Sequence, residues 1–363
     1  MTIRRDHLER FQVIDAADRI PTGVKRMLAG LYHRLSTWRN HLYDNHSLRS
    51  YRVDRPVVSI GNIAVGGTGK TPMVIYLVER LAKRRIRPVI ISRGYGGRGG
   101  QRPERVALDG SAAYFGDEPC LMARRFPDVP VVIARDRVKG ARWSIDQFDP
   151  DCLILDDGFQ HRKLSRNLDI VLVDSRRPFT TDHPLPLGQL RESPKNLSRC
   201  DIIVFTHYDE VLNRSGDWEY LQSIPNPPEI LTARHIPVQL RPMTSHAPSQ
   251  SPSLPVPVCL VSGIGSPDGF RATAIRAGLS PRHEIVYPDH HPIPPEAWRR
   301  AAEEADAAGC QAIVMTAKDE VRLSDGLSIS FPVYVLDMQI DVDNPERFED
   351  RVMRSILTNE LHT

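Results

Sequence analysis

The sequence predicts an α/β fold with a mainly parallel sheet and flanking helices, because short apolar strands alternate with amphipathic helical stretches. Apolar runs without polar alternation are typical of strands that are buried on both faces, as in parallel sheets. Five such runs follow one another in the first part of the chain: "PVIIS" from 88, "VPVVIA" from 129, "CLIL" from 152, "DIVLV" from 169 and "DIIVF" from 201.

A second alternating series predicts a smaller α/β unit in the last third of the chain. Its expected strands are "PVCLVSGI" from 257, "HEIVY" from 283, "QAIVMT" from 311 and "PVYVLDM" from 332. Between the two series, residues 224–257 are rich in proline and serine and show no apolar periodicity. We therefore expect an exposed connection there.

Composition limits the class of protein. The chain has 363 residues, which is long enough for two domains, and its 40% hydrophobic and 26% charged residues are ordinary for a soluble globular protein. The net charge of +3 does not by itself indicate a nucleic-acid partner. No apolar run reaches the roughly 18 residues of a spanning helix, and we expect a cytosolic protein. The cysteines form no CxxC pair, so we expect reduced, buried thiols at Cys120, Cys152, Cys200, Cys259 and Cys310.

The stretch "SIGNIAVGGTGKTP" from 59 predicts a phosphate-binding loop between a buried strand and a helix. Glycines allow positive φ and bring backbone amides close to an anion at the positive end of the helix dipole. Lys70 can then reach terminal phosphates, and Thr71 can bind Mg²⁺. Ala64 stands where the strict pattern has glycine, and an ordinary glycine-rich turn is the alternative interpretation. The predicted nucleotide-binding residues are Gly66, Gly67, Thr68, Gly69, Lys70 and Thr71.

The fold class is thus predicted as a P-loop NTPase-like parallel sheet with flanking helices, plus a smaller C-terminal α/β domain. The expected division is an N-terminal amphipathic helical region at 1–50, the P-loop domain at 51–225, a linker at 226–256 and the smaller domain at 257–363. The last helix is expected either in the smaller domain or packed back on the P-loop domain.

Paired carboxylates follow the strand "CLIL". Asp156 and Asp157 come at its carboxyl end, where parallel α/β sheets place their Mg²⁺ ligands, although one of the two could instead cap the next turn. Asp117, in "GDEP", precedes a helix and on its own would be interpreted as a helix cap. Together these residues provide the acid groups that phosphoryl transfer needs for metal binding and proton removal.

Two further loops carry charge. "LPLGQLRESP" from 185 places Arg191 and Glu192 in a rigid loop, which suggests a phosphate or metal contact, with a solvated turn as the alternative. "YPDHHP" from 287 places His290 and His291 beside Asp289. A histidine beside a carboxylate can relay a proton or bind a metal, and a surface turn is the alternative.

An amphipathic helix is predicted near the N-terminus. Its apolar stripe, with basic residues between, suits either a membrane interface or packing on the domain surface. The stripe consists of Val24, Met27, Leu28, Leu31, Tyr32, Leu35, Trp38 and Leu42, and the basic residues are Lys25, Arg26, Arg34 and Arg39.

Taken together, the motifs resemble the tetraacyldisaccharide 4′-kinase family, and the resemblance runs from about residue 24 to about residue 325. They are, in family order, "GNIAVGGTGKTP", "SRGYGG", "GDEP", "ILDDGFQH", "LPLGQLRE", "GIGSPDGF", "YPDHH" and "TAKDEVRL". The resemblance implies transfer of the γ-phosphoryl group of ATP, with Mg²⁺, to the 4′-hydroxyl of tetraacyldisaccharide 1-phosphate in lipid A biosynthesis. It also implies a peripheral position on the cytoplasmic face of the inner membrane, which favours a membrane-docking role for the N-terminal helix.

The resemblance also implies roles for single residues. Lys70 would stabilise the β and γ phosphates, Asp117 would act as the base, and His290 would be its partner. The Mg-ATP site would use Thr71, Asp156, Asp157 and Glu192, and the acceptor would contact Arg93, Tyr95, Arg137 and His161. Three positions depart from the family pattern: Ala64, the serine inserted in "LRESP", and the alanine of "TAKD". They bear on loop geometry rather than on a catalytic group.

Two other functions fit a P-loop: a GTPase or metallochaperone switch, and a kinase of a small soluble metabolite. Guanine selection uses an N/T-K-x-D motif after a late strand, and this chain has "THYD" from 206. Histidine replaces the lysine, which argues against the first alternative.

Overall fold

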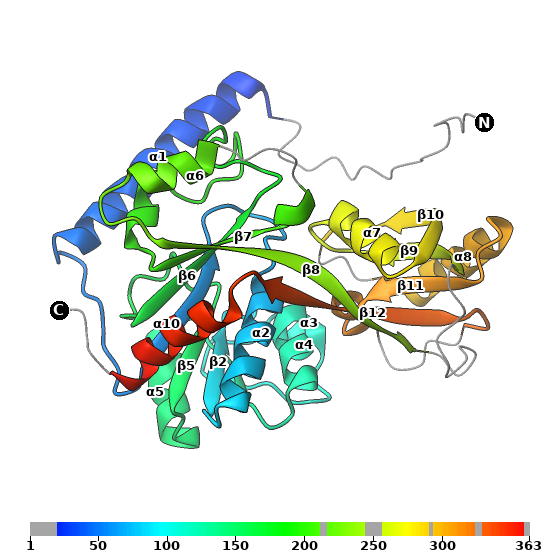
Figure 1. Ribbon diagram of the computed structural model, residues 1–363, viewed down its shortest axis with the longest axis horizontal. Coiled ribbons are helices and arrows are strands. Elements are labelled where there is room, and N and C mark those ends of the chain that lie inside the picture. Colours follow the sequence, from blue (N-terminus) through cyan, green and yellow to red (C-terminus); the bar gives the residue numbers. More distant parts are fainter. Residues whose placement is uncertain (1–19, 211–215, 244–255, 290–292, 324–328, 359–363) are drawn as a thin grey trace. The chain divides into compact units, whose positions relative to one another are not determined.

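The computed structural model describes residues 20–210, 216–243, 256–289, 293–323 and 329–358 (Figure 1). Two compact units are present. The larger contains Lys25–Val238 and the chain from Met338 onward, and the smaller contains Gln239–Asp337. Each is described separately below.

The larger unit is built on a mainly parallel sheet with β1 near its centre. The strand order is β8-β7-β6-β1-β5-β2-β4-β3, and only β3 pairs antiparallel to its neighbour among these described strands. The bounds are β1 Val57–Asn62, β2 Pro88–Ser92, β3 Glu104–Arg105, β4 Val131–Ile133, β5 Cys152–Asp156, β6 Leu168–Asp174, β7 Ile202–Thr206 and β8 Glu229–Pro242. Strands β1, β2, β4, β5, β6 and β7 are buried along their whole length, as their continuous apolar runs predict.

Helices cover the faces of this sheet because their apolar residues recur at helical spacing. Helix α2 begins directly after the glycine loop, and its residues Met73, Leu77 and Leu81 are buried. The helices of the unit are α1 Thr22–Asp44, α2 Lys70–Lys83, α3 Ala112–Phe115, α4 Asp117–Arg125, α5 Arg137–Phe148, α6 Gly216–Ser223 and α10 Pro345–Leu357, with 3₁₀ turns at Pro194–Arg199 and Tyr208–Glu210. The prediction of a P-loop-type α/β fold is confirmed.

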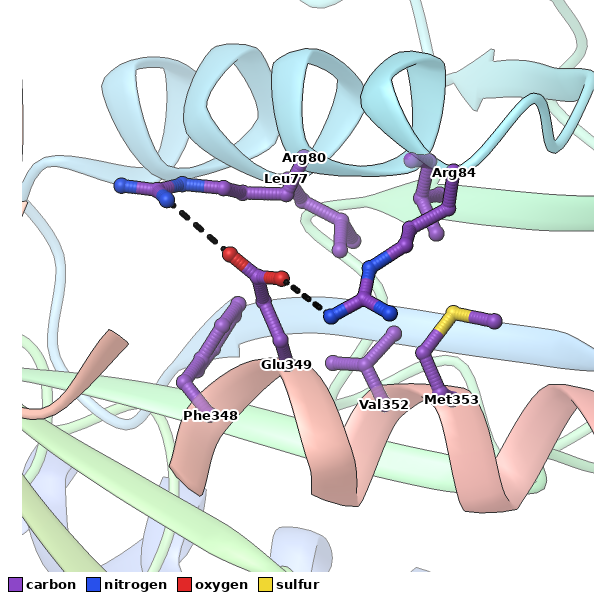
Figure 2. Close-up of a pocket in the computed structure, with 8 residues that line it drawn as sticks. Leu77, Arg80, Arg84, Phe348, Glu349, Val352 and Met353 are labelled. Carbon is purple, nitrogen blue, oxygen red and sulfur yellow. Dashed lines mark hydrogen bonds and ion pairs between the residues drawn. The ribbon is translucent and has the colours of Figure 1, made fainter. Parts of the chain in front are cut away.

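Helix α10, drawn red in Figure 1, packs against α2 although it comes from the end of the chain. Asn344 caps it by accepting a hydrogen bond from the amide of Arg347. Phe348, Val352 and Ile356 form its buried face, at i, i+4 and i+8. Figure 2 shows the crevice between the two helices, where Glu349 bonds Arg80 at 2.9 Å and Arg84 at 3.2 Å.

We expect Glu349→Gln to lower the free energy of unfolding by about 1 kcal/mol, because it removes the charge that two half-exposed arginines share. Urea unfolding monitored by circular dichroism measures this. Asp350→Asn, an exposed neighbour on the same helix, is the matched control. Equal stability of the two variants would show that the Glu349 ion pairs contribute nothing to the α2–α10 contact.

The smaller unit is a second parallel sheet with the strand order β10-β9-β11-β12. Trp298 is fully buried in its core, against apolar residues of the sheet such as Ile313 and Val335. The bounds are β9 Val256–Ser262, α7 Pro267–Arg276, β10 Leu279–Val286, α8 Pro295–Ala307, β11 Ala312–Thr316, α9 Ala317–Glu320 and β12 Val333–Val342.

Two of the sequence motifs meet inside this unit. The buried carboxylate of Asp319, in "TAKDE", accepts hydrogen bonds from the amide of Gly263 at 2.9 Å and from the hydroxyl of Thr316 at 2.6 Å. Arg322 also bonds Asp319, at 3.2 Å, and the carbonyl of Gly263, at 2.7 Å. These residues join the turn after β9 to the turn after β11, so the motif is structural at this position.

The predicted linker at 226–256 needs correction, because a 14-residue strand, β8, occupies Glu229–Pro242. In β8 every second residue from Leu231 to His235 is buried, a period-2 pattern that the proline-rich flanks concealed. The proline- and serine-rich stretch at 247–253 lies outside the described residues. The chain passes from the larger unit to the smaller after Val238, within β8, and returns to the larger unit after Asp337, within β12.

Candidate active site

The glycine loop leaves β1 and turns into α2 through two residues with positive φ, Gly66 at 112° and Gly69 at 88°. A side chain at Gly69 would be strained by the positive φ, and its Cβ would make a tight contact, 3.2 Å from the ring of His235. The loop is held by Thr68, whose hydroxyl accepts from Asn62 at 3.0 Å and whose carbonyl accepts from Thr206 at 3.1 Å. These two bonds tie the loop to the ends of β1 and β7.

The departure at Ala64 is accommodated by the neighbouring loop. Ala64 bridges Leu190, and the amide of Val65 donates to the carbonyl of Gln189 at 2.9 Å. This extended backbone makes no demand for glycine. The same contacts join the phosphate loop to the "GQLRE" loop.

Lys70, the first residue of α2, faces a carboxylate at the end of the neighbouring strand. Its Nζ lies 3.7 Å from Oδ1 of Asp157, and Arg191 donates to both oxygens of Asp157 at 2.9 Å. Burial alone would raise the pKa of Asp157, but Lys70 and Arg191 outweigh it and hold that pKa below its ordinary value. Asp157 is thus a carboxylate shared by two cations.

Asp156 is more buried than Asp157, and its pKa is raised rather than lowered. It is buried, and its Oδ2 accepts a hydrogen bond from Ser92 at 2.9 Å. Burial, followed by the nearby charges of Glu118 and Asp157, raises its pKa to about 7. Its Oδ1 is buried without a hydrogen-bond partner among the described residues. A buried carboxylate oxygen without a hydrogen-bond donor is suited to a cation.

These residues fit Mg²⁺. Within the described part of the chain, no three His, Cys, Asp or Glu side chains cluster closely enough to hold a metal by themselves. Mg²⁺ in nucleotide sites commonly takes one or two carboxylates and completes its shell with phosphates and water. The buried Oδ1 of Asp156 and the hydroxyl of Thr71 at the start of α2 suit that mode.

Glu192 does not share this arrangement. Its carboxylate is buried, and each oxygen accepts hydrogen bonds from neighbouring side chains. The donors are Asn40 at 2.8 Å, Gln160 at 3.0 Å, Asn196 at 2.9 Å and Arg199 at 3.1 and 3.3 Å. The structure therefore surrounds Glu192 with protein donors, and it does not fit as a direct metal ligand.

Asp117 is the first residue of α4, and Gly116 before it, with φ of 92°, takes the capping position. Asp117 is buried. The "SRGYGG" loop packs on this turn so closely that a Cβ on Gly97 would lie 2.7 Å from the amide of Gly116. The structure thus brings Asp117 next to the loop that carries Arg93 and Tyr95. Glu118, which sequence reasoning missed, acts electrostatically on Asp156, and its position in the "GDEP" motif was the available signal.

A buried arginine faces the two aspartates. Arg137, the first residue of α5, is only 4% exposed, and burial lowers its pKa although Asp156 and Asp157 act to raise it. Burial and then the charge of Arg137 lower the pKa of His161 to about 4, so its imidazole is neutral at pH 7. Tyr95 is exposed. The predicted acceptor residues thus include a buried cation that interacts with Asp156 and Asp157, and a neutral imidazole that this cation influences.

The second half of the proposed base pair lies outside the described residues, since these exclude 290–292. His290 and His291 are therefore not placed. Asp289, just before them, bonds Lys318 at 3.1 Å. The pairing of His290 with Asp117 stays a prediction.

A glycine loop that holds a lysine at the start of a helix, with acidic residues at the end of the adjacent parallel strand, defines a P-loop nucleotide-binding protein. A family model described as tetraacyldisaccharide-1-P 4′-kinase matches residues 24–357. The chain belongs to this family.

Curated relatives and a solved structure agree with that assignment. The chain is 36% identical to a tetraacyldisaccharide 4′-kinase of Syntrophus aciditrophicus over 93% of this chain and 94% of the relative. It is 37% identical to one from Anaeromyxobacter sp. strain K, over 84% and 82%. The crystal structure of LpxK from Aquifex aeolicus in complex with ATP is similar, with a TM-score of 0.71 and 28% identity, over 92% of this chain and 99% of that one.

Proposed function

We propose that the protein is an ATP-dependent kinase that transfers the γ-phosphoryl group to the 4′-hydroxyl of tetraacyldisaccharide 1-phosphate in lipid A biosynthesis. Membership of the family supports the reaction. The observation that carries it at the level of residues is the placement of Lys70 at 3.7 Å from Asp157, beside the buried Asp156. This arrangement stabilises charge on a transferred phosphoryl group.

In the proposed reaction the 4′-oxygen of the sugar bonds to the γ-phosphorus while the bond from that phosphorus to the bridging oxygen of ATP breaks. Asp117 takes the hydroxyl proton, with His290 as its partner, and ADP leaves. Lys70 and the amides of residues 66–71 stabilise the negative charge on the phosphates. Mg²⁺, held through Asp156, Asp157 and Thr71, would neutralise phosphate charge when it is bound.

For the acceptor we propose contacts with Arg93, Tyr95, Arg137 and His161. The acceptor is a phosphorylated sugar lipid, and a buried guanidinium such as that of Arg137 favours an anionic group. The neutral imidazole of His161 suits hydrogen bonding to a sugar hydroxyl. The exposed ring of Tyr95 can pack against the sugar.

We further propose that α1 docks peripherally on the cytoplasmic face of the inner membrane. None of the described helices is long and apolar enough to cross a bilayer. An apolar stripe on α1 nevertheless faces away from the protein, with exposed fractions of 41% to 68% at Val24, Met27, Leu31, Leu35 and Trp38. Lys25, Arg26 and Arg34 flank it and suit anionic headgroups, whereas Arg39 donates to the carbonyl of Gln160.

The direct test of the proposed reaction uses γ-labelled ATP, Mg²⁺ and tetraacyldisaccharide 1-phosphate in detergent micelles. We expect label to move into the lipid, at the 4′ position. Label that moves only to water, or to a soluble sugar but never to the lipid, would contradict the proposal. GTP in place of ATP tests the switch alternative.

For α1 we expect the double variant Leu31→Glu/Trp38→Glu to bind anionic vesicles at least about tenfold more weakly, because two carboxylates would enter the acyl region. Vesicle co-sedimentation measures this. Thr37→Glu/His41→Glu, which adds the same two carboxylates at exposed positions of this helix outside the stripe, is the matched control. Equal loss in both would show that net charge rather than the stripe controls binding.

A further inference from the structure

The inner face of α1 is bonded to the loops that carry the catalytic charges. Asn40, only 5% exposed, donates to Oε2 of Glu192 at 2.8 Å. The hydroxyl of Tyr32 donates to the carbonyl of Arg191 at 2.7 Å, and Arg39 donates to the carbonyl of Gln160 at 3.0 Å. Both the "GQLRE" loop and the "DDGFQH" loop are therefore tied to this helix.

Gln160 connects these contacts to the phosphate-binding residues. Its Nε2 donates to Glu192 at 3.0 Å and to the carbonyl of Asn62 at 2.8 Å, and its Oε1 accepts from Arg191 at 3.4 Å. Asn62 in turn bonds Thr68 of the glycine loop at 3.0 Å. The side chain of Gln160 thus contacts both the end of β1, next to the glycine loop, and the "GQLRE" loop.

These hydrogen bonds lead, through Arg191, to Asp157 and Lys70 of the proposed phosphate-binding site. Arg191 holds both oxygens of Asp157, and Asp157 lies 3.7 Å from Nζ of Lys70. Because Glu192 is buried, an oxygen that lost its donor would be left unsatisfied, so each donor helps to keep the loop in place.

We infer that Asn40 and Gln160 are positioning residues which, through Glu192, fix Arg191 and Asp157 around Lys70, and that α1 is part of the catalytic framework. The inference rests on the proposed kinase function. Misplacement of a catalytic charge by about 1 Å can lower the rate on the order of 100-fold. Loss of a hydrogen bond that positions Arg191 or Asp157 is therefore expected to lower kcat. Glu192 acts here as an anchor and not as a metal ligand.

The test is a donor–acceptor exchange. Asn40→Asp places a second carboxylate against Glu192, and Glu192→Gln removes the charge and replaces one acceptor oxygen with an NH2 group that faces other donors. We expect each single variant to lower kcat about 10- to 100-fold with little change in KM for ATP. The double variant Asn40→Asp/Glu192→Gln restores an amide–carboxylate hydrogen bond in the reverse sense, and we expect its kcat to recover at least about fivefold over either single variant.

The Mg²⁺ requirement separates the anchor from a metal ligand. Binding of a fluorescent ATP analogue is titrated with Mg²⁺ in the wild type and in Glu192→Gln. We expect the same half-saturating Mg²⁺ concentration in both. A several-fold higher requirement in Glu192→Gln, with no rescue by Asn40→Asp, would overturn the inference.

A variant of Gln160 keeps the test valid if the exchange variants do not fold. Gln160→Met preserves the length of the side chain and removes its hydrogen bonds, and thermal unfolding checks its folding. We expect a folded protein with reduced kcat, and an unchanged kcat would overturn the positioning role. Wild-type protein that transfers no label to lipid would instead contradict the proposed function, so the two failures are distinguishable.

Discussion

Replacing Lys70 by alanine is expected to lower kcat by about two to three orders of magnitude while the protein stays folded. The ammonium group stabilises charge on the phosphoryl group mainly in the transition state, so the loss falls on kcat more than on ATP affinity. Folding is preserved because Asp157 keeps its two 2.9 Å contacts with Arg191. The measurement is steady-state transfer of label from ATP to the lipid acceptor.

Lys83→Ala is the matched control for Lys70→Ala, because it removes an exposed lysine from the other end of α2. We expect near wild-type turnover from it. Near-normal turnover of Lys70→Ala itself would show that the loop does not hold the transferred phosphate.

Replacing Asp117 by alanine is expected to remove the chemical step and leave ATP binding intact. A positioned general base contributes about 10²- to 10⁴-fold, and kcat should fall by that factor. Asp117 is buried at the start of α4 beside the "SRGYGG" turn, on the acceptor side of the carboxylates Asp156 and Asp157 in the proposed reaction. Equilibrium binding of a fluorescent ATP analogue, measured together with label transfer, separates the two effects.

Asp109→Ala, at an exposed position before α3, is the control for Asp117→Ala. If ATP binding were lost together with activity in Asp117→Ala, Asp117 would be a metal ligand and not a base. Full activity in that variant would exclude both roles.

The sequence predicts the main sheet well because its strands are buried on both faces and read as continuous apolar runs, as in "CLIL" and "DIVLV". The phosphate loop is equally predictable, since glycine, lysine and threonine are required at fixed positions between a strand and a helix. Strand β8 was missed because half-buried residues and flanking prolines hide its alternation. Local pattern is most informative where burial is complete.

The site shows the same limit. The position of Lys70, Asp156 and Asp157 follows from strand ends, which parallel topology brings to one edge of the sheet. The environment of Glu192 could not be read from "LRE", because its donors come from residues as far away as Asn40 in the chain. For α1, apolar periodicity could not separate the two faces: Ala29 and Asn40 are buried, whereas Leu31 and Trp38 face outward.

The two-sided use of α1 has a practical consequence for preparing a version of this enzyme that needs no detergent. Deleting the first 45 residues would remove the exposed apolar stripe and also the inner-face residues Tyr32, Arg39 and Asn40. These three residues form hydrogen bonds to Arg191, Gln160 and Glu192, respectively. Loss of activity in the truncated protein would therefore not show that membrane binding is needed for catalysis. Substituting polar residues for the exposed apolar stripe, while the inner-face residues are kept, is the better way to obtain a soluble enzyme for inhibitor screening.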